Sequence, residues 1–549
     1  MKSVIISLLL LWVTLPALAD EGNHHEDLTP AQVGTVHFPT SCAASVQQTF
    51  QRGVALLHSF WYEEAEKDFQ QAAGHDPQCA MAHWGIAMSL WHQLWNRPDD
   101  ATMQRGLAEV EKAEALHPKT ARERDYIAAI GAFYRDSAKL DHQARATAYS
   151  NGMEKVYRSY PDDKEAAVFY ALSLLASEPE NDSSLANRKK AAAILEPLFT
   201  SEPDHPGVAH YLIHAYDTPE MAKLGLKAAR RYAKIAPAAP HALHMPSHIF
   251  ARLGLWQDDI NSNLASIAAT RKSAAMHMGG EGHQFHAMDF LVYAYLQSGR
   301  EAEARKIINE LKAMPAMSDM YGMGFNPVAS DLATFEASYA LELHHWAEAA
   351  ALSPVKGAPI GDNSMTYWAR AIGAAHIGDV QGARKDVEEI EAIHKQLVAE
   401  KKTDFANAVE RDRKQAAAWL AYAEHNNDEA LRLLRESAEK DDGVSDASDQ
   451  IPAREMLADL LLELKKPQEA LHQYQADLKL NPNRFNSLYG AARAAEAAGK
   501  AQEADLYYAT LVKVCAGSNS DRPELARAKS LVAQNSPPST RRPPRNVGQ

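Results

Sequence analysis

The residues best suited to chemistry in this sequence are histidines, and they are concentrated in one stretch. Residues 205–289 hold nine of the chain's 24 histidines. Within this stretch His210 and His214 are four residues apart, and so are His244 and His248. On a helix that spacing places both imidazole rings on one face. Neutral imidazoles that converge from neighbouring helices can ligate Zn or Cu, so these histidines are candidate metal ligands.

The two histidine pairs are themselves separated by a constant interval. The first histidines of the two pairs are 34 residues apart, and so are the second ones. Equivalent positions of two successive structural repeats therefore carry them, and a third repeat continues the pattern with a histidine, a carboxylate and a phenol. The metal site predicted from this register comprises His210, His214, His244 and His248, with Asp217 or Asp289 as a carboxylate ligand or as a hydrogen-bond partner of the ligands.

Two other interpretations of the histidines stay open. In the first, they cap and cross-link stacked helices as a polar zipper that binds nothing. In the second, they recognise an acidic or aromatic peptide. The polar residues Asp259 and Asn263 stand where a helix pair needs small and aromatic residues, and burying them without partners would cost roughly 1–3 kcal/mol each. We expect histidines of the facing helices to be those partners.

A hydrolytic metal enzyme is less favoured by the same pattern. Tyr211 follows His210 where the metalloprotease motif HExxH requires its glutamate. A catalytic site would also have to leave one coordination position of the metal for water. The sequence has no Gly-rich phosphate loop, nucleophile elbow or CxxC motif. Whether the chain is an enzyme is therefore undecided, and a binding role is favoured.

The elements that position these side chains are predicted to be short helices. Alternating runs of β-branched residues are absent, and the apolar segments of about a dozen residues end at Gly, Pro, Asp or Asn. Near the C-terminus Ala470 and Ala504 are 34 residues apart, as are Tyr474 and Tyr508. A small residue followed by a large one lets two antiparallel helices approach and fills the gap between them. The fold class predicted is all-α, a superhelical solenoid of antiparallel helix pairs.

These intervals resemble the tetratricopeptide repeat (TPR) family, whose repeat is 34 residues, from about Cys42 to Cys515. The segments FPTSC, CAMAHWG and HMPSHIF also resemble exported bacterial TPR proteins, a likeness that implies no activity. The family resemblance implies that the first helix of each repeat lines a concave ligand groove. The groove residues that it implies are His210, His214, His241, His244, His248, His286, Asp289 and Tyr293.

The start of the chain predicts export. Lys2, an apolar run from Val4 to Leu15 and the cleavage site Ala17-Leu18-Ala19 are typical of a secretory signal peptide, so we expect a periplasmic or secreted protein without membrane insertion after cleavage. The formal net charge of −14 gives no basic surface for nucleic acid. Three cysteines exclude a fully paired set. Cys42 and Cys79 lie close to predicted helix starts and are the expected bridge, with three free thiols as the alternative.

The function predicted first is an exported TPR scaffold whose groove binds a peptide, a protein partner or a metal ion. The alternative is a metal-dependent enzyme or metal-binding protein that uses a Zn or Cu ion at the histidine pairs; no cofactor is certain. The expected organisation is a signal peptide (1–19), a mobile N-terminal segment (20–41), a TPR-like solenoid with irregular spacers (42–440), an acidic linker (441–450), a C-terminal TPR pair (451–515) and a disordered Pro/Arg-rich tail (516–549).

Overall fold

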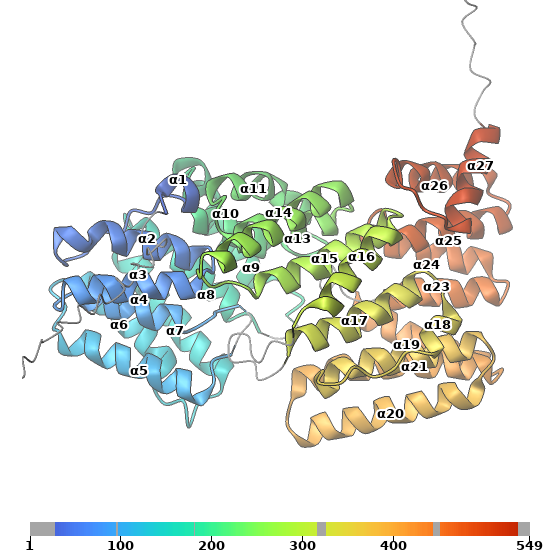
Figure 1. Ribbon diagram of the computed structural model, residues 1–549, viewed down its shortest axis with the longest axis horizontal. Coiled ribbons are helices and arrows are strands. Elements are labelled where there is room, and N and C mark those ends of the chain that lie inside the picture. Colours follow the sequence, from blue (N-terminus) through green and yellow to red (C-terminus); the bar gives the residue numbers. More distant parts are fainter. Residues whose placement is uncertain (1–27, 95–96, 180–181, 316–325, 443–450, 536–549) are drawn as a thin grey trace, which may run out of the picture.

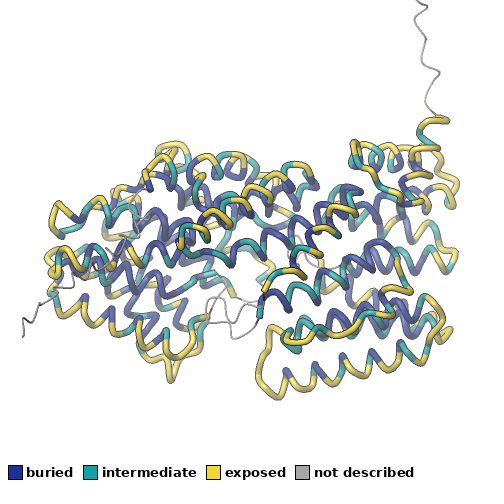
Figure 2. The backbone as a smooth tube through the Cα atoms, in the orientation of Figure 1, coloured by how far each residue is buried: buried dark blue, intermediate teal, exposed yellow. Residues whose placement is uncertain are grey.

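The computed structural model describes residues 28–94, 97–179, 182–315, 326–442 and 451–535. Those residues form helices joined by short turns, with no β-strand among them. Helices that follow one another in the chain pack side by side, and the pairs stack into an elongated molecule (Figure 1). Buried residues lie between the helix layers and exposed residues on the outer faces (Figure 2). The predicted all-α solenoid of helix pairs is confirmed.

The first of three hydrophobic cores holds the N-terminal half together, from Leu28 to Met278. Its helices are α1 (Pro30–Val33), α2 (Gln47–His58), α3 (Tyr62–His75), α4 (Ala80–Ser89), α5 (Asp100–Ala115), α6 (Ala121–Tyr134), α7 (His142–Ser159), α8 (Lys164–Ala176), α9 (Ala186–Ser201), α10 (Pro206–Tyr216), α11 (Ala222–Ile235), α12 (Pro240–His244) and α13 (Pro246–Arg252), with a 3-10 turn at Ala44–Val46.

Two further cores follow along the chain. The middle core is formed mainly by α14 (Trp256–Ala275), α15 (His283–Gln297), α16 (Glu301–Ala313) and α17 (Pro327–Glu342). The C-terminal core extends from Ala337 to Ala528. Its further helices are α18 (Trp346–Ala350), α19 (Ile360–His376), α20 (Val380–Ala399), α21 (Thr403–Ala423), α22 (Asn427–Asp441), α23 (Ala453–Glu463), α24 (Pro467–Leu480), α25 (Phe485–Ala497), α26 (Ala501–Val514) and α27 (Pro523–Asn535).

Glycines in first helices allow neighbouring helices to pack closely. A Cβ atom added at Gly85 of α4 would lie 2.3 Å from Cδ1 of Phe69 on α3, and one added at Gly490 of α25 would lie 2.2 Å from Cζ of Tyr474 on α24. Both aromatic rings are fully buried. Each ring therefore occupies the space that a side chain at the glycine would take, so a small residue on one helix faces a large one on its neighbour.

The solenoid also makes contacts between repeats that are distant in sequence. Trp256 Nε1 of α14 donates to the backbone oxygen of Asn483, 3.0 Å away, and α15 contacts α25. The buried guanidinium of Arg484 donates to Glu455 over 2.8 Å, to Glu342 and to the hydroxyl of Tyr293 over 3.2 Å. Because an ideal solenoid joins only neighbouring repeats, these contacts tie the C-terminal repeats to the middle of the chain.

Both ends of the described chain are more ordered than predicted. Residues 28–41 were expected to be mobile, yet Phe38 is fully buried with its ring 5.4 Å from that of Trp84. The tail from residue 516 was expected to be disordered, yet α27 packs Leu525 and Ala528 into the C-terminal core. In both places a few apolar residues are enough to hold the segment in position, because they pack against a large hydrophobic core. The predicted signal peptide (1–19) lies outside the described residues.

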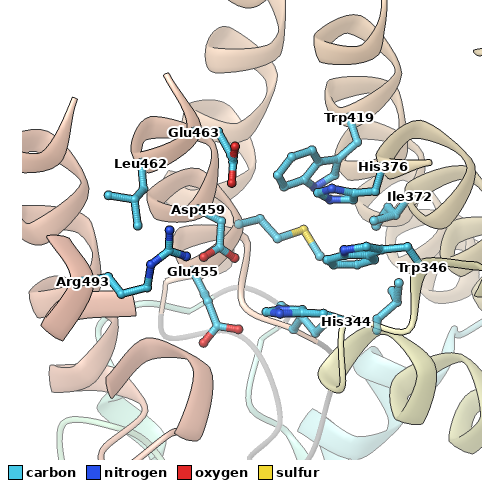
Figure 3. Close-up of a pocket in the computed structure, with 13 residues that line it drawn as sticks. His344, Trp346, Ile372, His376, Trp419, Glu455, Asp459, Leu462, Glu463 and Arg493 are labelled. Carbon is cyan, nitrogen blue, oxygen red and sulfur yellow. The ribbon is translucent and has the colours of Figure 1, made fainter. Parts of the chain in front are cut away.

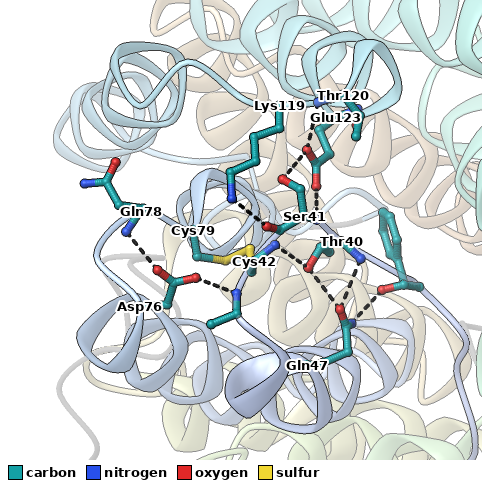
Figure 4. Close-up of a disulfide and its surroundings, with 12 residues drawn as sticks. Thr40, Ser41, Cys42, Gln47, Asp76, Gln78, Cys79, Lys119, Thr120 and Glu123 are labelled. Carbon is teal, nitrogen blue, oxygen red and sulfur yellow. Dashed lines mark hydrogen bonds between the residues drawn. A yellow bond between two sulfur atoms is a disulfide. The ribbon is translucent and has the colours of Figure 1, made fainter.

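The predicted disulfide is confirmed, since Cys42 and Cys79 are joined (Figure 4). The carboxylate of Asp76 accepts hydrogen bonds from the backbone N–H of Ala43 over 2.7 Å and of Gln78 over 3.1 Å, so it fixes the backbone on both sides of the bridge. The bridge joins the start of the solenoid to the turn before α4. The third cysteine, Cys515, is free and buried.

Candidate metal centre

Six histidines from three successive repeats meet in the interior of the N-terminal half. His210 and His214 lie on α10, His241 and His244 on α12, His248 on α13 and His286 on α15. Pro246 separates α12 from α13, because it has no N–H to continue the helix. Four of the six are buried, with exposures of 0% for His210, 1% for His241, 1% for His244 and 6% for His248. His214 and His286 are less buried.

The first cluster consists of His210, His214 and His241. The Nε2 atom of His210 is 3.0 Å from Nε2 of His241 and 3.0 Å from Nε2 of His214. One nitrogen from each of the three rings lies within 4.8 Å of the others. Three ring nitrogens thus lie close together, as the ligands of a metal ion do.

The second cluster consists of His244, His248 and His286. Nε2 of His244 is 3.1 Å from Nε2 of His248, and the three rings again offer nitrogens within 4.8 Å of one another. Zn–N bonds of 2.0–2.1 Å at a tetrahedral angle place neighbouring nitrogens about 3.3 Å apart. The Nε2 pairs that include His210 or His244 therefore have nearly the spacing that a bound ion would require.

Hydrogen bonds at the opposite ring nitrogens fix the tautomers of three histidines. Nδ1 of His210 is 2.6 Å from the backbone oxygen of His58, and Nδ1 of His248 is 2.8 Å from a carboxylate oxygen of Asp217. Both oxygens only accept, so Nδ1 carries the proton in each ring. In a neutral ring Nε2 is then an unprotonated lone pair, the form that ligates metals.

Asn263 fixes the tautomer of His244 in the same way. Its Oδ1 lies 2.7 Å from Nδ1 of His244, and its Nδ2 donates to Oδ1 of Asp259 over 2.7 Å. Nδ2 also donates to the backbone oxygen of Asp259 over 3.1 Å, an atom that only accepts, so the amide orientation is fixed and Nδ1 of His244 is the donor. The prediction that a histidine of a facing helix would pair with the polar pair of α14 is confirmed for Asn263.

These tautomers create an electrostatic conflict that a cation would remove. The Nε2 atoms of His244 and His248 face each other at 3.1 Å, and both are acceptors. A shared proton would also relieve the repulsion, but burial holds the pKa of His244 well below its usual range. Burial likewise lowers the pKa of His210 to about 3. At neutral pH His210 and His244 are therefore neutral, and a metal ion would satisfy the lone pairs on their Nε2 atoms.

The two clusters are adjacent. The ring centroids of His241 and His244 are 6.1 Å apart, and those of His214 and His248 are 6.3 Å apart. Ions held in both clusters would therefore be close neighbours within one buried centre.

Charged and aromatic groups support the ligand rings from outside. Burial alone would raise the pKa of Asp217, but Arg252 and His248 hold it well below its usual range, so its carboxylate is ionised where it accepts from His248. The ring of Phe60 stacks on His241 with centroids 5.2 Å apart, and Tyr232 stacks on His210 at 5.0 Å. These contacts fix the ring orientations and exclude water.

Two predicted site residues lie elsewhere. Asp289 belongs to neither histidine cluster, and its charge raises the pKa of the buried Asp259 further beyond the effect of burial. The hydroxyl of Tyr293 accepts from Arg484 at the contact between α15 and α25. His286, one turn before Asp289, contributes the third ring of the second cluster, and His241 completes the first. The sequence placed both histidines in the groove but not among the metal ligands.

A third histidine cluster has no need of a metal. Nε2 of His58 and Nε2 of His205 lie 2.9 and 2.8 Å from the two oxygens of Glu165, and Nδ1 of His58 is 2.9 Å from the hydroxyl of Tyr211. Although burial alone would raise the pKa of Glu165, the two histidines lower it. Every ring nitrogen of His58 thus has a partner, and its backbone oxygen holds His210 in place.

Comparisons with known proteins identify neither a family nor a ligand for this chain. No protein-family model matches the sequence, and no curated protein sequence is similar to it. Among solved structures, the human IFIT1 dimer with m7Gppp-AAAA aligns over 80% of this chain and 90% of its own, at 12% identity and a TM-score of 0.35. A monomeric IFIT1 mutant with Gppp-AAAA aligns over 86% and 98%, at 12% identity and 0.35. Likeness of this degree supports no inference about a ligand.

No helix among the described residues is both long and apolar enough to cross a membrane. Export and the lack of nucleic-acid binding, both inferred from composition and the N-terminal sequence, stay predictions.

Proposed function

We propose that this chain is an exported, TPR-like metal-binding protein that holds two transition-metal ions in its adjacent three-histidine clusters. The observation that carries the proposal is the pair of Nε2 lone pairs of His244 and His248, which face each other at 3.1 Å with both protons fixed on Nδ1. The conflict between them is resolved by a bound cation. In the first cluster Nε2 of His210, whose proton is likewise fixed on Nδ1, lies 3.0 Å from Nε2 of both His214 and His241.

The two rival interpretations fit the geometry less well. A histidine zipper without metal requires an N–H between each pair of ring nitrogens, and the tautomers leave none between His244 and His248. A peptide groove requires exposed side chains, whereas His210, His241 and His244 are at most 1% exposed. Burial and hydrogen bonding thus favour a small ion as the ligand.

The ligand set indicates which ions fit. Each cluster offers three imidazoles and no carboxylate or thiolate. Imidazole ligands suit Zn, Cu, Fe and Ni, and affinity along that series is greatest for Cu. We propose Cu or Zn, as the histidine spacing predicts. Three protein ligands leave a tetrahedral ion one open position, which is the arrangement of catalytic sites, so a metal-dependent enzyme is the second candidate function.

Metal analysis tests the proposal. The full chain, purified without a histidine tag or an immobilised-metal column, is dialysed against Zn or Cu and analysed for bound metal. We expect about two equivalents per chain and about one for His244→Ala, since the second cluster then has two ligands. His472→Ala, which changes an exposed histidine on α24, is the control and should retain both. A wild-type chain that binds neither ion would overturn the proposal.

A further inference from the structure

A cavity of about 170 Å³ lies in the C-terminal half, among helices that carry none of the six histidines (Figure 3). One side is formed by aromatic rings from α18, α19 and α21 and from the turn before α18. The opposite side is formed by carboxylates of α23. The ring side, called the aromatic wall, comprises His344, Trp346, His376 and Trp419.

The rings of the aromatic wall lie against one another in a row. Trp346 lies against His376 with ring centroids 3.9 Å apart and planes at 10°, and against His344 at 4.8 Å. His376 in turn lies 4.3 Å from Trp419. Burial lowers the pKa of His344 to about 3 and that of His376 to about 4, so both rings are neutral at pH 7. The wall therefore presents π faces and no positive charge.

The facing side carries three carboxyl groups and one cation. Glu455, Asp459 and Glu463 line the cavity together with a single cation, Arg493. Glu455 is held by Arg484, with Nε and Oε2 2.8 Å apart, while Asp459 accepts from the hydroxyl of a buried tyrosine on α24. Burial, with repulsion from Glu455, raises the pKa of Asp459 to about 8. An arriving cation would stabilise the ionised form of this carboxyl.

One buried donor on the aromatic wall has no acceptor. Trp419 is 3% exposed, and its Nε1 has no hydrogen-bond partner among the residues that the structure describes. Leaving such a donor unsatisfied costs about 1–3 kcal/mol. A ligand with a hydroxyl beside its charged group would offer the missing acceptor.

We propose that this cavity binds an organic ammonium group. A cation over the face of tryptophan gains roughly 0.5–2 kcal/mol, and a cation beside Asp459 favours the ionised form of that carboxyl, which then attracts it. The volume limits the ligand to a small head group, since a cavity of roughly 150 Å³ accommodates benzene. The head group is that of a free amine or of a lysine side chain. The site is independent of the metal centre.

Calorimetric titration of the full chain tests the charge requirement. Choline and 3,3-dimethyl-1-butanol have the same shape, but only choline carries a positive charge. We expect choline to bind at least about tenfold more tightly, a difference of 1.4 kcal/mol. Equal binding of the two, or no binding of either choline or Nα-acetyl-lysine amide, would overturn the proposal. Binding of the lysine derivative alone would assign the cavity to a peptide side chain.

Substitutions locate the binding in this cavity. Asp459→Asn keeps the shape but removes the carboxyl that a bound cation would ionise, and Trp346→Leu removes a ring, so each should weaken binding of the ammonium probe about tenfold. Asp428→Asn, an exposed change on α22, is the matched control and should leave affinity unchanged. Thermal melts and metal content show whether each variant is folded. Folded Asp459→Asn and Trp346→Leu variants that bind as tightly as the wild type would place the site elsewhere.

Discussion

At the scale of single residues, the candidate metal centre depends on which nitrogen of each histidine carries the proton. The spacing of four within a helix and of 34 between repeats predicts that the rings share a surface, and this is a property of the chain alone. The division of the rings into two clusters of three cannot be predicted from the sequence, because it depends on how neighbouring helices cross. His58 contributes through its backbone oxygen, 2.6 Å from Nδ1 of His210, and a backbone group leaves no signal in a sequence.

Asp217 offers the sharpest test at this scale. Its carboxylate accepts from Nδ1 of His248 and from Nε of Arg252, 2.8 and 2.9 Å away, so it orients a ligand without belonging to either cluster. Removing such a partner typically lowers metal affinity about 10–100-fold. We expect Asp217→Asn to do so while the metal stoichiometry at saturation is retained. Competition with a chromogenic chelator measures the affinity; an unchanged affinity would contradict the role of Asp217.

The neutral histidines also predict how acid affects the metal-free protein. Burial lowers the pKa of His210 to about 3 and that of His241 well below its usual range, whereas in the unfolded chain both titrate near 6.5. Below pH 6.5 the unfolded chain therefore binds more protons, and stability falls with falling pH by up to about 1.4 kcal/mol per pH unit for each such ring. Chelator-treated protein melted from pH 8 to 5 should lose stability below 6.5; a flat profile would contradict it.

At the scale of the helix pair, the sequence predicts the packing better than the site. The interval of 34 residues and the pairing of a small with a large residue follow from local helix geometry and from contacts between neighbouring helices. The ends of the chain were predicted less well, since composition alone does not reveal that Phe38 or Leu525 meets a core. The acidic linker was identified from composition too, and residues 443–450 of it lie outside the described part of the chain.

Gly85 and Gly74 provide a matched pair for this packing. In a helix, alanine is normally more stable than glycine by about 0.5–1 kcal/mol. A methyl group at Gly85 would overlap Phe69, whereas nothing lies within 4 Å of the position at Gly74. Overpacking a core costs about 1–3 kcal/mol, so it outweighs the helix preference. We expect Gly85→Ala to destabilise and Gly74→Ala to stabilise in denaturant melts; the same sign for both would refute the interpretation.

At the scale of the whole molecule, Arg484 decides how strongly the C-terminal repeats are coupled to the rest. The sequence predicts a C-terminal repeat pair (451–515) set apart from the rest by an acidic linker (441–450). The guanidinium of Arg484, however, joins Tyr293 of α15, Glu342 of α17 and Glu455 of α23, and it is fully buried. The 34-residue spacings between neighbouring repeats do not predict a contact between repeats that are far apart in sequence.

Arg484→Met tests this coupling. The change leaves two buried carboxylates, Glu342 and Glu455, without their cation, and breaking a buried ion pair from one side costs about 3–5 kcal/mol. We expect one melting transition to split into two, with the C-terminal repeats unfolding first. Adding Glu342→Gln should recover part of the loss, because it removes one uncompensated charge. Arg432→Met, whose ion pairs are exposed to solvent, is the control and should leave the melt unchanged. If Arg484→Met also leaves a single unshifted transition, the three helices are held together by apolar packing and not by this charge network.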